Sequence, residues 1–338
     1  MKKLWEFVKS SYLKIGVIFT VAFTALYPKL PSIYITHTWV YIRLEDFLIA
    51  IVVAAWFVQL LRRKVRFPFP VGIPIFLYWF FAFLSFVFSL IFVGPYITNF
   101  FPKIAALSYG RRLEYMILFF VAFTTIKSVK DVRDYLVGLS VTMVGIVIYG
   151  FGQHYYLAFW HMFPKFFETY PFCFPSFQTG NEEFAKGIPL CLPADARATS
   201  TFAGHYDLAA YLVVFIPVLF GFFITVKNKL AKISLALLST LSVMLLIFTS
   251  SRTSFLTYLF GIIMAIIFLK KKKYLIPVIA ISIALLFVFN GSTVNRFLDT
   301  IRIITVVTDN QGHVIGSTQN SLPSDLQKKI SKNPVVVG

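Results

Sequence analysis

The chain has 338 residues, of which 58% are hydrophobic, 18% are aromatic and only 14% carry a formal charge. A soluble domain has about 25% charged residues, so this composition excludes an ordinary soluble fold. The net charge of +18 does not indicate a nucleic-acid partner, because the lysines and arginines lie in short groups between long apolar runs. We therefore expect an all-α fold, a polytopic bundle of transmembrane helices.

Nine apolar runs approach the length of about 20 residues that a membrane-spanning helix needs. The first run follows a basic N-terminal head and lacks a small-residue cleavage site, so we expect an uncleaved first helix rather than a signal peptide. The nine runs form an expected transmembrane domain over 1–290. They are 11–30, 44–61, 71–93, 113–126, 135–153, 206–226, 231–249, 254–269 and 274–290.

The segments between these runs alternate in character. Four of them are short and basic, and the positive-inside rule places them in the cytoplasm together with the N-terminus. The intervening segments, including the long ones at 94–112 and 154–205, are then expected on the outer side of the membrane. The basic connectors are 61–67, 126–134, 226–232 and 270–273.

A single charge interrupts the apolar run 233–269, namely Arg252 in the stretch "TSSRTSF". Lys232 and Lys270 fix both ends of this run on the inner side, so we expect a helical hairpin with Arg252 in its outer turn. An arginine that snorkels and caps a helix end is one interpretation.

Two other outer-side spans begin with arginine. Arg111 and Arg112 precede the fourth span, and Arg197 precedes the sixth. By this topology the inner side carries 14 Lys and 4 Arg, whereas the outer side carries 7 Lys and 7 Arg. Arginine binds phosphate oxygens through a planar fork and stays charged when partly desolvated. We therefore expect Arg197 and Arg252, with Arg111 or Arg112 as a third, to bind the diphosphate of a lipid carrier.

Acidic residues also open the second span, after Arg43. We expect Arg43, Glu45 and Asp46 to pair with one another or to cap the helix, although Glu45 or Asp46 could orient an outer arginine.

Several of these stretches resemble one family. "RATSTFAGHYDLAAYLVVFIPVLF" (197–220) and "LLIFTSSRTSFLTYLFGIIMAIIF" (245–268) are similar to two elements of the O-antigen ligase and polymerase superfamily. "GRRLEY" (110–115) and "RLEDFLIAI" (43–51) also fit, and the likeness covers 40–290.

The resemblance implies a multi-pass glycosyltransferase of the bacterial inner membrane with its active face outward. Such an enzyme takes a glycan from a polyprenyl-diphosphate carrier and transfers it to lipid A core, another glycan or a protein. It also implies that outer-face arginines bind the diphosphate, a role that falls here on Arg197 and Arg252. The partners implied are the donor, the acceptor and membrane lipid.

The transfer reaction sets further requirements. An acceptor hydroxyl attacks the anomeric carbon and expels a lipid diphosphate, whose growing charge guanidinium groups stabilise. No Asp-x-Asp pair occurs in an outer loop, so we expect no metal and no cofactor. The hydroxyl needs a general base within hydrogen-bond reach. The candidates are His205, Asp207 and Glu114, followed by His154 and His161.

The chain departs from the family after 274–290, where family members have a large outer loop with a functional histidine and then further spans. Here 291–338 offers an expected strand–turn–strand at 301–318 and a short helix at 322–330. Its one histidine, His313, reads as an ordinary surface residue. We expect this segment to be the start of a large outer loop in a longer protein.

The outer loop 154–205 contains the aromatic and proline-rich stretch 155–178. This stretch suits a sugar-stacking platform or a lid, and equally an interfacial aromatic belt. Cys173 and Cys191 lie in the same loop, where a disulfide and two free thiols are both open.

Rival functions remain. A ligase, a polymerase and a protein oligosaccharyltransferase are not separable from these residues. A transporter or flippase of lipid-linked glycans would also need outer arginines. It would usually add polar residues at mid-span, whereas the mid-span positions here are nearly all Phe, Leu, Ile and Val.

Overall fold

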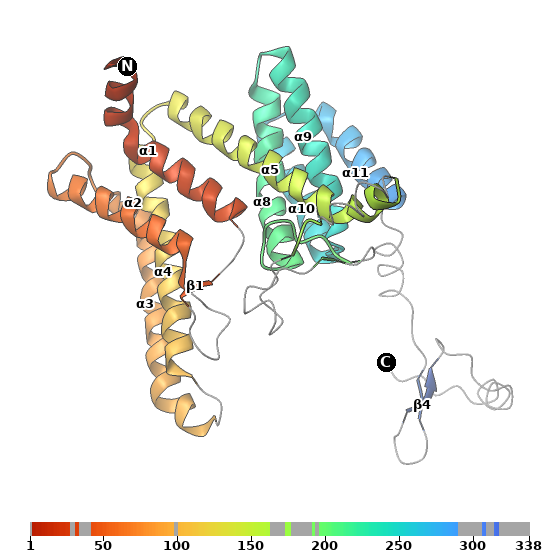
Figure 1. Cartoon of the computed structure of the whole chain (residues 1–338), viewed down its shortest axis with the longest axis horizontal. Coiled ribbons are helices and arrows are strands. Elements are labelled where there is room, and N and C mark those ends of the chain that lie inside the picture. The colour runs from red at the N-terminus through yellow and green to blue at the C-terminus, as the bar shows by residue number, and fades with distance from the viewer. Residues whose placement is uncertain are drawn as a thin grey trace.

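The computed structural model describes 2–27, 31–33, 42–97, 101–162, 173–176, 191–192, 196–289, 306–308 and 314–317. Within these residues the fold is helical, with two short hairpins (Figure 1). The helices are α1 (Lys2–Leu26), α2 (Leu44–Leu61), α3 (Phe69–Phe88), α4 (Pro102–Thr125), α5 (Val129–Met162), α8 (His205–Thr225), α9 (Lys229–Phe248), α10 (Arg252–Phe268) and α11 (Leu275–Phe289). A π-turn (Ser89–Val93) and a 3-10 turn (Gly94–Tyr96) extend α3, and another 3-10 turn (Lys272–Tyr274) precedes α11.

Each of the nine expected spans falls on one of these helices. Among the described residues, six helices are long and apolar enough to cross a membrane, and they include α2, α5, α8 and α9. The apolar parts of α1 (Tyr12–Leu26) and α10 are shorter. The chain is therefore a helical protein with several segments of membrane-spanning length and composition, and nine crossings stays a prediction.

The helix ends differ from the expected spans. Helix α1 starts at Lys2, α4 starts at Pro102, and α5 runs on to Met162. Hydropathy marks the apolar part of a helix, whereas its end depends on local backbone chemistry. Proline at the first helical position suits the start of α4. At the start of α5 the Asp131 N–H donates to Ser128 Oγ at 3.3 Å, which is one half of a capping box.

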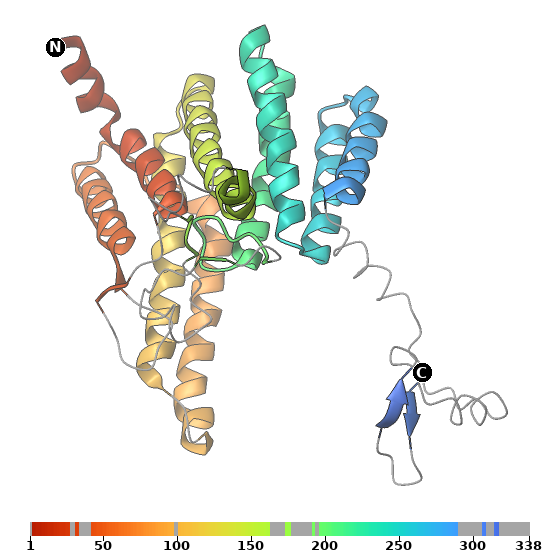
Figure 2. The same ribbon diagram turned by 45° about the vertical axis from the view of Figure 1, so that its right-hand side comes forward.

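The basic connectors lie at a common end of the bundle. Figure 2 shows the N-terminus and the turns α4–α5, α8–α9 and α10–α11 toward the top, with the α9–α10 turn and the α3–α4 connection toward the bottom. Contacts bring the α2–α3 connector to the same end, because Lys64 and Lys127 line one cavity with Lys14. The strict alternation of the predicted topology agrees with this arrangement, while its orientation in a membrane stays a prediction.

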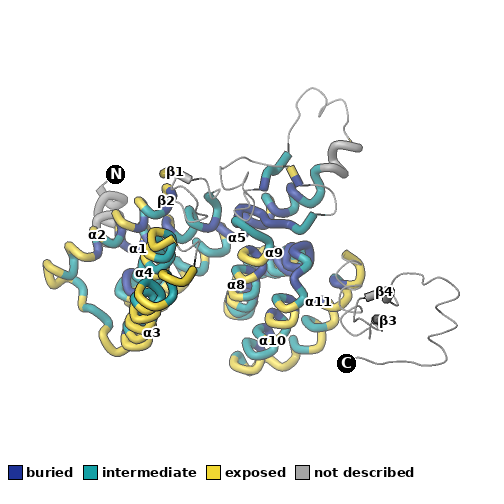
Figure 3. The backbone as a smooth tube through the Cα atoms, turned by 90° about the horizontal axis from the view of Figure 1, so that it is seen from below, coloured by how far each residue is buried: buried dark blue, intermediate teal, exposed yellow. Residues whose placement is uncertain are grey.

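Buried apolar side chains form two clusters. One joins α1, α2 and α4 around Val17, Trp56 and Phe120, and the other joins α5, α8, α9, α10 and α11. Figure 3 shows exposed positions along the outward faces of α3, α10 and α11. Close packing of α5 on α9 needs a glycine, since a Cβ on Gly150 would lie 2.5 Å from Leu245 Cδ1.

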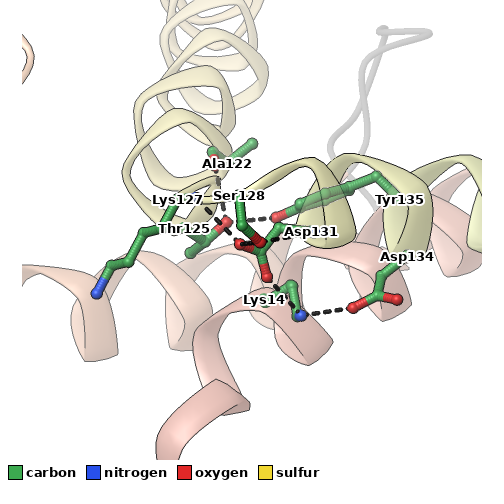
Figure 4. Close-up of polar contacts among 8 residues, drawn as sticks. All are labelled: Lys14, Ala122, Thr125, Lys127, Ser128, Asp131, Asp134 and Tyr135. Atoms are coloured by element: carbon green, nitrogen blue, oxygen red, sulfur yellow. Dashed lines mark hydrogen bonds and ion pairs between the residues drawn. The ribbon is translucent and has the colours of Figure 1, made fainter.

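One buried cation fastens the first cluster to α5 (Figure 4). The Lys14 ammonium donates to Asp131 Oδ1 at 2.8 Å and to Asp134 Oδ2 at 2.6 Å, so α1 is tied to the start of α5. Ser128 Oγ donates to the other oxygen of Asp131 at 2.8 Å. Both acidic side chains of the basic connector 126–134, Asp131 and Asp134, are thus paired with Lys14.

The outer segments are described in part. Strands β1 (Pro31–Ile33) and β2 (Ile42–Arg43) are antiparallel, as are β3 (Val306–Thr308) and β4 (Val314–Ser317). The latter pair confirms the expected strand–turn–strand. A disulfide joins Cys173 to Cys191, which decides between the two thiol alternatives. The expected helix at 322–330, His313 and residues 163–172 and 177–178 of the aromatic stretch lie outside the described residues.

The alternating topology makes a direct prediction about two exposed lysines. Lys271 lies in the α10–α11 connector, predicted to be inside, and Lys103 lies at the start of α4, predicted to be outside. In intact spheroplasts, a membrane-impermeant maleimide is expected to label Lys103→Cys and to leave Lys271→Cys unlabelled until the membrane is permeabilised. The native cysteines do not react with the maleimide because they are bonded to each other. The opposite labelling pattern would refute the orientation.

Candidate functional site

The segment before α8, residues 196–204, is irregular backbone packed among apolar helices. The side-chain amide of Gln153, on α5, hydrogen-bonds to several backbone groups of this segment. Its Oε1 accepts from the Ser200 N–H at 2.7 Å and from the Thr199 N–H at 3.2 Å. Its Nε2 donates to the carbonyls of Ser200 and Pro175, both at 3.1 Å. One amide therefore fixes two separate pieces of the outer loop.

Three hydrogen bonds from hydroxyl groups complete the attachment. Ser200 Oγ donates to the carbonyl of Ile146 at 2.7 Å, and Thr201 Oγ1 donates to that of Ala25 at 2.6 Å. Ser176 and Thr199 join their hydroxyls at 2.9 Å. Ser200 has a φ of 50°, a left-handed conformation that costs a non-glycine residue strain and needs such bonds to hold it. The "TST" stretch is thus a structural anchor.

The anchor places Arg197 beside the α9–α10 turn. The Ala198 N–H donates to the carbonyl of Phe248, the last residue of α9, at 3.1 Å. After the turn 249–251 the chain enters α10 at Arg252, which is half-buried. The hairpin expected around Arg252 is therefore present, and a single backbone bond links it to the residue that follows Arg197.

Arg197 contacts one of the candidate bases directly. Its guanidinium nitrogen lies 2.8 Å from Nε2 of His205, the first residue of α8. A guanidinium only donates hydrogen bonds. A hydrogen bond at this distance requires Nε2 to accept, which corresponds to the tautomer with its proton on Nδ1. Asp207 follows in the first turn of α8 and is exposed.

Arg111 belongs to another group of charges. Its guanidinium pairs with Asp46 Oδ2 at 3.0 Å, and the same oxygen accepts from the Arg43 N–H at 2.9 Å. Arg43 in turn lies 3.4 Å from Glu45 Oε1. The start of α2 therefore shows both of its expected features, pairing and capping within itself and a carboxylate that orients an outer arginine.

Two further predicted site residues lie on α4 with Arg111. Glu114 lies beside Asp46 and Arg111, whereas Arg112 is exposed. These contacts join α2 to α4, and Figure 1 shows those helices on one side of α5 with α8 and α10 on the other. The predicted residues thus fall into two groups, one around Arg197 and one around Arg111.

The remaining candidate bases are His154 and His161, and the structure describes the side chain of His154 alone. The ring of His154 stacks on that of Phe248, with centroids 3.9 Å apart, so it packs under the α9–α10 turn. The side chain of His161 lies outside the described part of the chain. Tyr156 of α5 donates to the carbonyl of Leu192 at 2.9 Å, one residue beyond the disulfide.

Gln153 was missed from the sequence, although a signal was available. It is a lone amide near the outer end of an apolar helix and is 3% exposed. Buried polar groups need partners, so such an amide indicates irregular backbone packed against it.

Comparison with known proteins gives no match. No family model, no curated protein and no solved structure matches the chain.

Replacing Gln153 tests the anchor. Gln153→Leu leaves the N–H groups of Thr199 and Ser200 without their acceptor, and each unsatisfied buried group costs about 1–3 kcal/mol. We expect a lower midpoint of thermal unfolding in detergent and protease cleavage within 196–204. Gln59→Leu, on α2, is the matched control: it removes only a solvent-exposed hydrogen bond to Tyr12 Oη, so it should lower the unfolding midpoint less and cause no cleavage within 196–204. Equal unfolding midpoints for both variants would contradict the anchoring role.

Proposed function

We propose that the protein transfers a glycan from a polyprenyl-diphosphate carrier to an acceptor hydroxyl at the outer face of a bacterial inner membrane, as an O-antigen ligase does. The contact between Arg197 and His205 carries the proposal. It brings a guanidinium to 2.8 Å from an imidazole nitrogen at the start of α8, and the start of α8 lies at the end of that helix opposite the α8–α9 connector.

Rigid support favours Arg197 as a diphosphate ligand. Its neighbours Ala198 to Thr201 bond to three helices, so the backbone that carries the guanidinium is held in place before a ligand arrives. A cation held close to a developing negative charge stabilises the transition state. Arg252, at the adjoining turn, supplies a second guanidinium for the same anion.

The same contact suggests how donor and base are coupled. While Arg197 donates to His205 Nε2, the lone pair of that nitrogen is occupied. A diphosphate is a stronger acceptor for guanidinium than a neutral imidazole, because charged hydrogen bonds are the stronger ones. Donor binding therefore turns Arg197 toward the diphosphate and frees Nε2.

The freed imidazole then acts as general base. Its Nε2 takes the proton of the acceptor hydroxyl while the oxygen attacks the anomeric carbon from the face opposite the leaving group. The new glycosidic bond forms as the bond from carbon to the diphosphate oxygen breaks, and polyprenyl diphosphate leaves with the electron pair. The product is inverted at the anomeric carbon. Asp207 and Glu114 are the alternative bases.

A transfer assay tests the proposal. Purified protein in nanodiscs receives a polyprenyl-diphosphate glycan and, in separate reactions, lipid A core, free glycan or a serine-containing peptide. We expect product with one acceptor class, and a loss of about 10²–10³-fold for Arg197→Ala, the range for removing one transition-state donor. His205→Ala should lose activity while still binding the donor.

The control is Arg63→Ala in an inner connector, which should leave the rate unchanged. Product formation at the parental rate by Arg197→Ala would contradict the proposal. Donor binding without product from any acceptor, together with movement of the lipid between leaflets, would favour a transporter instead.

A further inference from the structure

A large cavity opens between α5 and the α8–α9 pair at the end of the bundle that carries the basic connectors. Its volume is about 870 Å³. The cavity follows from the packing, since α5 and α9 touch closely at Gly150 and Leu245 and separate toward their other ends. Figure 2 shows the same divergence toward the top. This site is independent of the proposed outer site.

The walls of the cavity suit hydrocarbon. Residues such as Leu136, Val137 and Phe222 line it. The hydroxyls of two polar lining residues bond to their own helices, Ser140 to the carbonyl of Leu136 at 2.7 Å and Thr225 to that of Phe222 at 2.9 Å. Because these hydroxyls already donate to backbone carbonyls, an occupant of the cavity need not supply acceptors for them.

The mouth of the cavity is cationic and polar. Arg133 enters from α5, while Lys227 and Asn228 enter from the α8–α9 connector. Asn228 uses its Oδ1 to cap α9, accepting from the Leu230 N–H at 2.9 Å, which leaves its amide N–H groups as donors.

Nearby carboxylates do not neutralise this mouth. Asp131 and Asp134 flank Arg133 in sequence, but both bind Lys14 on the side of α5 that faces α1 (Figure 4). Among the described residues, Arg133 and Lys227 form no ion pair. Two cations therefore line an apolar cavity, one from α5 and one from the α8–α9 connector.

We propose that this cavity binds one anionic diacyl phospholipid of the inner leaflet, such as phosphatidylglycerol. Its phosphodiester lies between Arg133 and Lys227, its glycerol hydroxyls meet Asn228, and its acyl chains fill the space between α5, α8 and α9. Basic pockets between membrane helices on the cytoplasmic side bind anionic head groups in this manner. The lipid fills the space between α5 and α9 where these two helices diverge.

Native mass spectrometry of the full chain tests this site. The protein is mixed with phosphatidylglycerol and phosphatidylethanolamine of identical acyl chains, and the ratio of the two adducts is measured. The parent is expected to prefer phosphatidylglycerol. The double variant Arg133→Gln, Lys227→Gln should lose that preference, by roughly fivefold for each basic residue removed near the membrane surface.

Two further variants keep the test specific. Lys271→Gln with Lys272→Gln removes the same charge from another inner connector and should keep the preference. Ala231→Phe fills the cavity and should lose the phosphatidylglycerol adduct with both cations present. An unchanged preference in the first double variant, an equal loss in the Lys271 and Lys272 control, or full lipid binding by Ala231→Phe would each overturn the proposal. A protein dimer that excludes lipid from this face would overturn it as well.

Discussion

Backbone polar groups placed among apolar helices must be paired, and this constraint decides how the end of the bundle opposite the basic connectors is built. Residues 196–204 are not helical, yet they lie against α1, α5 and α9. The Gln153 amide, the carbonyls of Ala25 and Ile146 and the carbonyl of Phe248 satisfy them. Because those groups belong to three helices, the segment locks the helices together and fixes the positions of Arg197 and the start of α8.

The outer arginines are not equivalent once their neighbours are known. Arg111 lies 3.0 Å from a carboxylate oxygen that also caps α2, so its charge serves to join α2 to α4. Arg197 instead lies against the His205 ring, and no carboxylate of the described residues forms an ion pair with it. An anion gains more from the second arrangement. Under the proposed function, this difference favours Arg197 over Arg111 as the diphosphate ligand, a ranking that residue type alone does not supply.

The helices could be predicted from the sequence, and so could the connectors that share one end of the bundle, because apolar runs and basic connectors are local signals. The hairpin around Arg252 and the strand–turn–strand near 306–317 are local in the same way. The contacts that build the site are not. Gln153 meets Thr199 across 46 residues and Lys14 meets Asp131 across 117, and no pattern of hydropathy specifies such partners. The helix starts at Lys2 and Pro102 were missed because hydropathy does not report local capping.

The central claim is that Arg197 and Arg252 bind one diphosphate, and a binding measurement tests it without knowledge of the acceptor. Native mass spectrometry would compare polyprenyl diphosphate with polyprenyl monophosphate on the parent, Arg197→Ala and Arg252→Ala. The account predicts a diphosphate adduct on the parent that exceeds the monophosphate adduct and falls in both variants. Equal diphosphate adducts on all three proteins would contradict it and would leave Arg252 as an arginine that snorkels at the end of α10.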